Sequence, residues 1–98
     1  MTPDALSLGG DLTIMRAADL RETLLARLAE APPVLALDLG AVSDFDSAGV
    51  QLLLATRRAL HEAGARLVIV AASPTVRSSL ALFGLGALLE PAAEGGTA

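Results

Sequence analysis

The chain has 98 residues, which is enough for one domain with a single hydrophobic core but leaves no room for a second. Its formal net charge of -4, its two aromatic residues and the scattering of its seven basic residues argue against nucleic acid as a partner, because phosphate contacts need clustered cations and base stacking needs aromatic rings. The sequence contains no cysteine, which excludes disulfides, thiol nucleophiles and thiolate metal sites and suits a reducing compartment.

Apolar residues make up 53% of the sequence, but they occur in short blocks separated by charged residues, Gly and Pro. No block approaches the roughly 20 residues of a membrane-spanning helix. The start of the chain, MTPDALSLGG, also lacks the basic residues and the apolar run of a secretion signal. We therefore expect a cytoplasmic protein without direct membrane insertion.

The N-terminal third predicts a hairpin followed by a helix. In ALSLGGDLTIM, apolar and polar residues alternate on either side of Gly9 and Gly10, so we expect strands near residues 5–8 and 11–15 joined by a tight turn. Residues 17–31 then follow helical spacing and end at the proline pair 32–33. The apolar face of this helix is Ala17, Leu20, Leu24, Leu28 and Ala31.

Two compact apolar runs, 34–39 and 66–72, predict central strands of a sheet. The segment between them has helical spacing after Ser47, and Gly64 provides its stop. Strand, helix and strand in this order form a crossover between parallel strands, which places the start of the helix at the carboxyl edge of the sheet. Ser47 is therefore expected at that edge.

The C-terminal third predicts a third, shorter helix with Ser73 as N-cap, Pro74 in the first helical position and Gly84 as terminator. Residues 85–91, LGALLEP, predict a last edge strand, and the tail 91–98 is expected to be disordered because it has nothing to bury. We expect the core to be built from Leu24, Leu28, Leu37, Leu53, Leu54, Val68 and Val70, with Arg57, Arg58 and Arg66 solvated.

The predicted fold class is therefore α/β. One domain occupies residues 1–98, with its core at about 5–90. It combines a mostly parallel mixed sheet of 4–5 strands, an N-terminal hairpin and about three helices.

Ser47 is the residue that most needs an explanation. Either Ser47 or Asp46 is suited to cap the second helix, and capping alone would account for both residue types. Ala48 and Gly49 have little side chain, however, so the first turn should be open to a partner.

Nucleophilic catalysis by Ser47 is not supported. Phe45 stands where a hydrolase elbow needs glycine, and the single histidine, His61, lies 14 residues further along the same helix, roughly 20 Å away. His61 is expected to be solvated near the C-terminus of that helix.

Metal and cofactor chemistry is not supported either. Asp38, Asp44 and Asp46 lack the spacing of a cation-binding loop, and the glycines match no nucleotide-binding motif. We expect no metal, no cofactor and no enzymatic activity. The remaining role for the Ser47 hydroxyl is that of a phosphate acceptor, because a helix N-terminus tolerates an anion while a partner surface would be repelled by it.

Two stretches together resemble the STAS domain, which is named for sulphate transporters and anti-sigma-factor antagonists. They are LALDLGAVSDFDSAGVQLLLATRRAL at 35–60 and RLVIVAASPTVRSSLALFGL at 66–85, and the resemblance spans about residues 5–90. Its most specific part is FDSAG at 45–49, which is similar to the hydrophobic-Asp-Ser/Thr-Ser/Ala-Gly element of the family at the start of the second helix.

The resemblance implies a small α/β domain that acts by protein–protein contact. Ser47 matches the hydroxyl that bacterial antagonists present to an anti-sigma factor that is also a Ser/Thr kinase, Asp46 matches the acidic residue before it, and Gly49 matches the small residue that keeps the helix start open. In that scheme the unmodified antagonist captures the kinase and frees a sigma factor, and phosphorylation by ATP reverses this. These three positions are the ones that the resemblance carries over, and Asp44 departs from the family pattern, in which an aromatic or aliphatic residue is common. With the acidic Asp44 and the small Ala48 beside them, the expected partner-binding edge is Asp44, Asp46, Ser47, Ala48 and Gly49.

The stretch DSAGVQLLL also resembles STAS proteins of two other settings. One is a small subunit that binds the ATPase of a phospholipid ABC transporter, and the other belongs to chemotaxis signalling complexes. Both imply a constitutive subunit without phosphorylation. A homodimer also stays open as an alternative.

Overall fold

The computed structural model describes residues 5–89, and within them the chain forms an α/β domain. The elements in chain order are β1 (Leu6–Ser7), β2 (Gly10–Leu12), α1 (Ala17–Leu28), β3 (Val34–Leu39), β4 (Val42–Phe45), α2 (Ser47–Glu62), β5 (Arg66–Ala72), α3 (Pro74–Leu82) and the short 3-10 helix η1 (Gly86–Leu89).

The strands form two small sheets in which every pairing is parallel. One sheet has the order β1-β3-β5 and the other pairs β2 with β4. In the first, Leu37 of β3 lies between Leu6 of β1 and Ile69 of β5; in the second, Leu12 is in register with Phe45. The carboxyl ends of β2 and β4 therefore meet at one edge, where α2 begins.

The N-terminal hairpin expected from Gly9 and Gly10 is wrong. Gly10 does have a φ of 77°, but β1 and β2 do not pair with each other. The segment instead runs beside β3 and β4: the Leu8 N–H donates to the Asp38 carbonyl at 3.1 Å, and the Gly10 N–H donates to the Ala41 carbonyl at 3.2 Å. Residues 6–12 therefore run alongside β3 and then β4, and Gly9 and Gly10 lie where the chain passes from the first sheet to the second.

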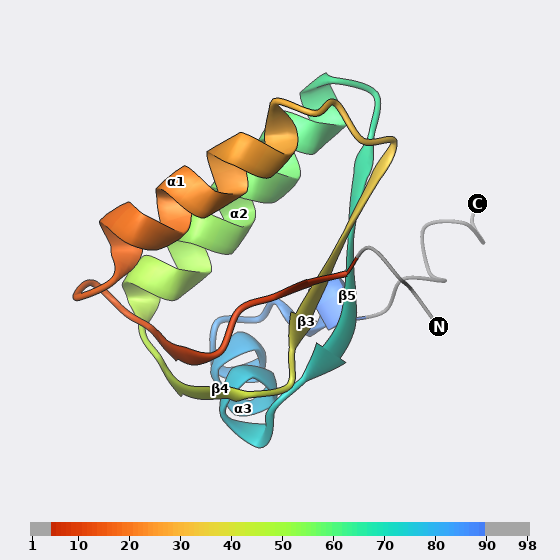
Figure 1. Ribbon diagram of the computed structural model, residues 1–98. Helices are drawn as coiled ribbons and strands as arrows, with labels where there is room; N and C mark the ends of the chain where they lie inside the picture. The colour runs from red at the N-terminus through yellow and green to blue at the C-terminus, as the bar shows by residue number, and fades with distance from the viewer. Residues whose placement is uncertain (1–4, 90–98) are drawn as a thin grey trace.

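The helices pack on these sheets in two groups. Figure 1 shows α1 and α2 side by side, with α2 next to β5, while α3 lies at the other side of the molecule against β4. η1 contacts β5 and α3. Side chains from all of these layers meet in one core, formed by Leu8, Leu12, Leu20, Leu24, Leu35, Leu37, Leu39, Val42, Leu53, Leu60, Ile69, Val76 and Leu80.

The core prediction is confirmed at Leu24, Leu37 and Leu53, which are fully buried. Leu28, Leu54 and Val68 are only half-buried.

The prediction that Val70 belongs to the core is wrong, because this residue is 42% exposed. A bulge explains it: Leu37 is in register with Ile69 and Asp38 with Ala71, so Val70 is skipped and the alternation of β5 shifts. β5 also lies at an edge of its sheet among the described residues and is not the central strand that we expected.

The end of the described chain also differs from the prediction. Residues 86–89 form η1 where an edge strand was expected, because Leu85, Leu88 and Leu89 pack inward against the core. The rest of that segment and the tail 91–98 lie outside the described residues. Of the helices within 5–89, none is long and apolar enough to cross a membrane.

Candidate functional site

The site is built where β4 ends and α2 begins. Asp46 is the N-cap of α2, with extended backbone angles, and its Oδ1 accepts hydrogen bonds from the N–H groups of Ala48 at 2.9 Å and Gly49 at 3.2 Å. Of the two capping candidates, Asp46 therefore fills the role. This leaves Ser47 as the first helical residue, with its side chain not needed for the cap.

The Ser47 side chain is exposed. Within residues 5–89 its hydroxyl makes no hydrogen bond, so nothing described has to be displaced before a partner reaches it. Two of the N–H groups at the start of α2 already donate to Asp46, and the positive end of the helix dipole lies beside Ser47. The hydroxyl is thus accessible to a partner.

The second oxygen of Asp46 binds a distant segment. Asp46 Oδ2 accepts a hydrogen bond of 3.2 Å from the N–H of Ile14, 32 residues earlier in the chain. The hydrogen bonds to Asp46, above all that from Ile14, hold the pKa of its carboxyl below the ordinary value, although partial desolvation acts in the opposite direction. Asp46 therefore joins the start of α2 to the loop between β2 and α1.

That loop, Thr13–Arg16, is held by its own hydrogen bonds. Thr13 Oγ1 donates to Asp11 Oδ2 at 2.8 Å and accepts from the Met15 N–H at 3.3 Å, while Arg16 Nη1 donates to the Gly9 carbonyl at 2.9 Å. We predicted strand up to residue 15 and therefore missed this loop as part of the site. The only sequence signal for it was indirect: parallel strands bring their carboxyl ends to one edge.

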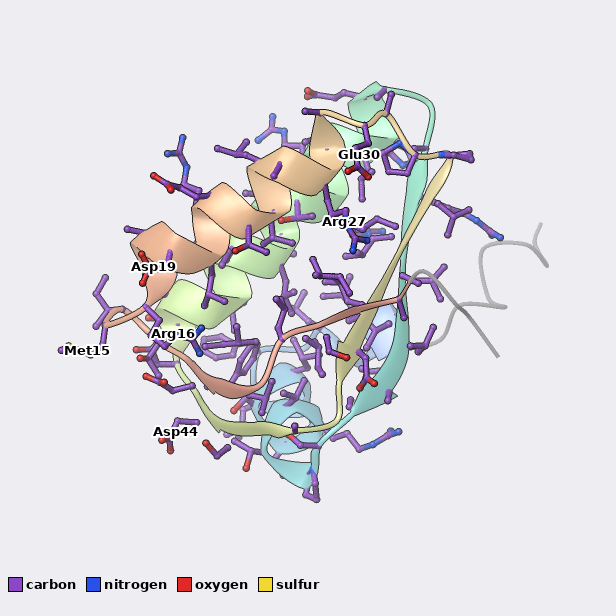
Figure 2. All side chains as sticks on the ribbon, viewed as in Figure 1. Met15, Arg16, Asp19, Arg27, Glu30 and Asp44 are labelled. Atoms are coloured by element: carbon purple, nitrogen blue, oxygen red, sulfur yellow. The ribbon has the colours of Figure 1, made fainter. Side chains whose placement is uncertain are left out.

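Acidic residues gather at this edge. Asp44 is exposed and lies in register with the half-buried Asp11, and Figure 2 shows Met15, Arg16 and Asp44 at the same end of the molecule. Asp38 lies elsewhere, in β3, where its Oδ1 accepts from the Gly40 N–H at 2.9 Å. In the part of the chain that the structure describes, no three acidic or histidine side chains are grouped so as to hold a metal ion.

Gly49 has a different role from the one expected. It is buried, and a methyl group there would overlap the Leu12 carbonyl oxygen and lie 2.9 Å from two ring atoms of Phe45. Glycine is thus required by the close approach of β2 and Phe45 beneath the helix, and Gly49 does not keep the outer surface open. Of its neighbours in the predicted edge, Ser47 is exposed and Ala48 is half-buried.

The opposite end of α2 carries charges of both signs. His61 is exposed in the last turn, too far along the helix to act on Ser47. Arg57 and Arg58 are exposed as expected, and Arg58 Nε lies 3.5 Å from Glu62 Oε2. Arg66 is exposed at the start of β5.

Comparison with known proteins gives the family. The family model described as "Mlab, STAS domain" matches residues 2–90. The anti-sigma-F factor antagonist RsfB of Mycobacterium tuberculosis, found in two strains, is 32% identical over 80 residues, which are 82% of this chain and 65% of that protein. The chain therefore spans a little less than two thirds of the length of these relatives.

Solved structures agree with this assignment. The anti-sigma factor antagonist SpoIIAA in its unphosphorylated form superposes with a TM-score of 0.74 at 26% identity, over 97% of this chain and 86% of that one. An anti-sigma factor antagonist from Mycobacterium paratuberculosis gives 0.76 at 29% identity, over 92% and 79%. With its α/β fold, its FDSAG element and these matches, the chain belongs to the STAS domain family.

Proposed function

We propose that this domain is a phosphorylation-controlled binding module of the anti-sigma-factor-antagonist type, which works by contact and not by turnover. Its partner is an anti-sigma factor that is also a Ser/Thr kinase, and Ser47 is the phosphate acceptor. The observation that carries the proposal is the exposed, unbonded Ser47 hydroxyl in the first turn of α2, set free by Asp46 as the cap. Both an ATP-using kinase and a sigma factor imply the cytoplasm.

The comparisons support the kind of partner. RsfB is an antagonist of an anti-sigma-F factor, and the SpoIIAA structure is that of an anti-sigma factor antagonist in its unphosphorylated form. In the proposed reaction, Ser47 Oγ attacks the γ-phosphorus of ATP, the bond to the β-γ bridging oxygen breaks, ADP leaves, and the hydroxyl proton passes to a base of the kinase.

The charges at the site explain how a phosphate would act as a switch. It would add about two negative charges next to Asp46 and close to Asp44. The dipole of α2 offsets part of this within the domain, whereas a partner surface fitted to the neutral hydroxyl meets new like charge or desolvation. A loss of about 3 to 4 kcal/mol in binding free energy would turn a tight complex into a weak one.

The test uses ATP and each purified anti-sigma-factor kinase from the genome that carries this chain. We expect one of them to add a single phosphate, located at Ser47 by mass spectrometry. Ser47→Ala should abolish the phosphate, while Ser43→Ala, which alters another exposed serine four residues earlier, should leave it unchanged. Labelling that survives Ser47→Ala, or no labelling by any kinase, would contradict the proposal.

The same proteins separate the switch from a constitutive subunit. The switch requires Ser47→Asp to weaken binding more than Ser47→Ala does. Equal binding by both variants would instead indicate a constitutive STAS subunit, of the kind that contacts the ATPase of a phospholipid ABC transporter or a chemotaxis complex.

A further inference from the structure

Two neighbouring large apolar side chains, here called the Ile14–Met15 pair, point into solvent next to the site. Ile14 is 70% exposed and Met15 is 84% exposed. Single apolar residues on a surface need no explanation, but two in sequence at one loop tip form a patch that the fold itself does not use. Neither residue belongs to the core.

The backbone that carries the pair is fixed. The Met15 N–H donates to Thr13 Oγ1, the Arg16 N–H donates to the Thr13 carbonyl at 2.9 Å, and the Ile14 N–H donates to Asp46. A loop held in this way loses little conformational entropy when it binds, so its apolar side chains can contribute most of their burial to affinity.

The position of the pair connects it to the phosphate acceptor. Asp46, which accepts the Ile14 N–H, directly precedes Ser47 in the chain. The pair and the Ser47 hydroxyl thus lie at the same edge of the molecule, and Figure 2 shows Met15 there, pointing away from the ribbon. The hydrogen bond from Ile14 thus holds this loop against the residue that precedes Ser47.

We propose that the Ile14–Met15 pair is the apolar anchor by which the kinase partner is held and selected. The pair would enter an apolar pocket on the partner, and basic side chains around that pocket would face Asp11, Asp44 and Asp46. This inference rests on the proposed function and adds to it the partner contact that decides specificity.

The surrounding charge favours a protein over a lipid surface. The acidic residues beside the pair would be repelled by anionic headgroups, and the one cation in the loop, Arg16, already donates to the Gly9 carbonyl. A partner with basic side chains around an apolar pocket would complement both the acidic residues and the Ile14–Met15 pair. Apolar anchors of this kind commonly dominate the affinity of protein interfaces.

The test measures the dissociation constant for the kinase that phosphorylates Ser47. The double variant Ile14→Ser/Met15→Ser should weaken binding by about 10- to 100-fold. The matched control is Leu82→Ser in α3, whose side chain is 86% exposed, and it should bind like the wild type. Thermal unfolding should be unchanged in both, because none of these side chains is in the core.

Kinetics and a conservative variant sharpen the test. In the double serine variant, the KM for phosphorylation of Ser47 should rise while kcat stays the same, because the pair does not touch the reacting atoms. Ile14→Leu/Met15→Leu keeps the apolar surface and should restore affinity to within about threefold of the wild type.

The outcomes distinguish the two proposals. If the kinase phosphorylates Ser47 but binds the double serine variant as tightly as it binds Leu82→Ser, the anchor is overturned and the switch stands. If no kinase binds or phosphorylates the wild type, the proposed function fails and the anchor fails with it. Co-sedimentation of the wild type with phosphatidylserine–phosphatidylcholine vesicles, lost in the double serine variant, would assign the pair to a membrane and overturn the anchor as well.

Discussion

The Asp46 carboxylate has two structural tasks, one for each oxygen. Oδ1 caps α2 and Oδ2 accepts the Ile14 N–H, so this side chain fixes both the acceptor helix and the neighbouring loop. An asparagine at this position is a good helix cap, but its amide has only one accepting oxygen. Its NH₂ group would face either the helix N–H groups or the N–H of Ile14.

We therefore predict that Asp46→Asn destabilises the domain in a pH-dependent way. The pKa of Asp46 is lowered in the folded protein, so its carboxylate contributes stability above the unfolded pKa of about 3.9, and this contribution is lost as the pH falls through the folded value. The difference in denaturation midpoint between wild type and variant should be full near pH 7, shrink below about pH 4 and be smallest near pH 2.

Urea denaturation followed by circular dichroism measures this difference at each pH. The neutral cap in Asp46→Ser should show the same dependence on pH, because it also lacks the carboxylate. A difference that stays constant from neutral to acid pH would mean that the charge of Asp46 does not contribute to the stability of the fold.

For single residues, the sequence predicts local features of the site but not the contacts between distant segments. The start of α2 and the exposure of Ser47 could be predicted from FDSAG, because helix starts have local signatures, whereas the choice between Ser47 and Asp46 as the cap came from the structure. The hydrogen bond from the Ile14 N–H to Asp46 could not be predicted, because it joins residues 32 positions apart that strand pairing brings together. Gly49 was recognised as important, but the contact that demands it, with the Leu12 carbonyl, is equally non-local.

At the scale of elements, the three helices are confirmed, and so are the strands expected at 34–39 and 66–72, whereas the pairing of β1 with β2 was wrong and β4 was not predicted. The Ser73 cap of α3 and the end of α2 near Gly64 are confirmed, because caps and stops are written in adjacent residues. The strand pattern was ambiguous: Gly9 and Gly10 suit a hairpin turn as well as a bend between two sheets. No strand was predicted for β4, since its four residues, Val42–Phe45, are too few to show periodicity.

The ends of α1 and α2 offer a matched pair of backbone tests. Ala31, which follows α1, has a φ of 52°, and Gly64, which follows α2, has a φ of 78°. This conformation costs a residue with a Cβ about 1 to 2 kcal/mol, whereas glycine adopts it freely. A Cβ at Gly64 would have no atom within 4 Å, so the cost there is one of backbone conformation alone.

We predict opposite changes for the two substitutions. Ala31→Gly should stabilise the domain by about 0.5 to 1 kcal/mol, because relief of the strained φ exceeds the entropy that glycine adds to the unfolded chain. Gly64→Ala should destabilise it by a similar amount. Urea denaturation with an unchanged m-value checks both, and a loss of stability in Ala31→Gly would show that the backbone at residue 31 is not strained.

On the scale of the whole molecule, charge is distributed along α2. Asp46 caps its N-terminus, with Asp44 nearby in β4, and its C-terminal part carries Arg57 and Arg58 together with Glu62, which pairs with Arg58. The Asp46 carboxylate faces the positive end of the helix dipole and stabilises the helix there, whereas Glu62 in the last turn faces the negative end. The start of α2 also presents an acidic edge to a partner, which orients the approach of a basic surface.

Phosphorylation of Ser47 is predicted to change binding without changing the fold. The net charge would move from -4 to about -6, with the added charge confined to the start of α2, where the dipole tolerates it. The unfolding midpoint should shift by less than about 4 °C, since the core residues are untouched. Amide NMR shifts should change only around residues 44–50 and in the loop Thr13–Arg16, which Asp46 joins to the helix.

The affinity for the kinase should fall by about 100- to 1,000-fold, and the fall should be smaller at 0.5 M salt than at 0.05 M because exposed like charges are screened. Shifts that spread through α1 and β5 would mean that phosphate acts by remodelling the domain. A loss of affinity that does not depend on salt would mean that it acts by steric exclusion at Ser47 and not by charge.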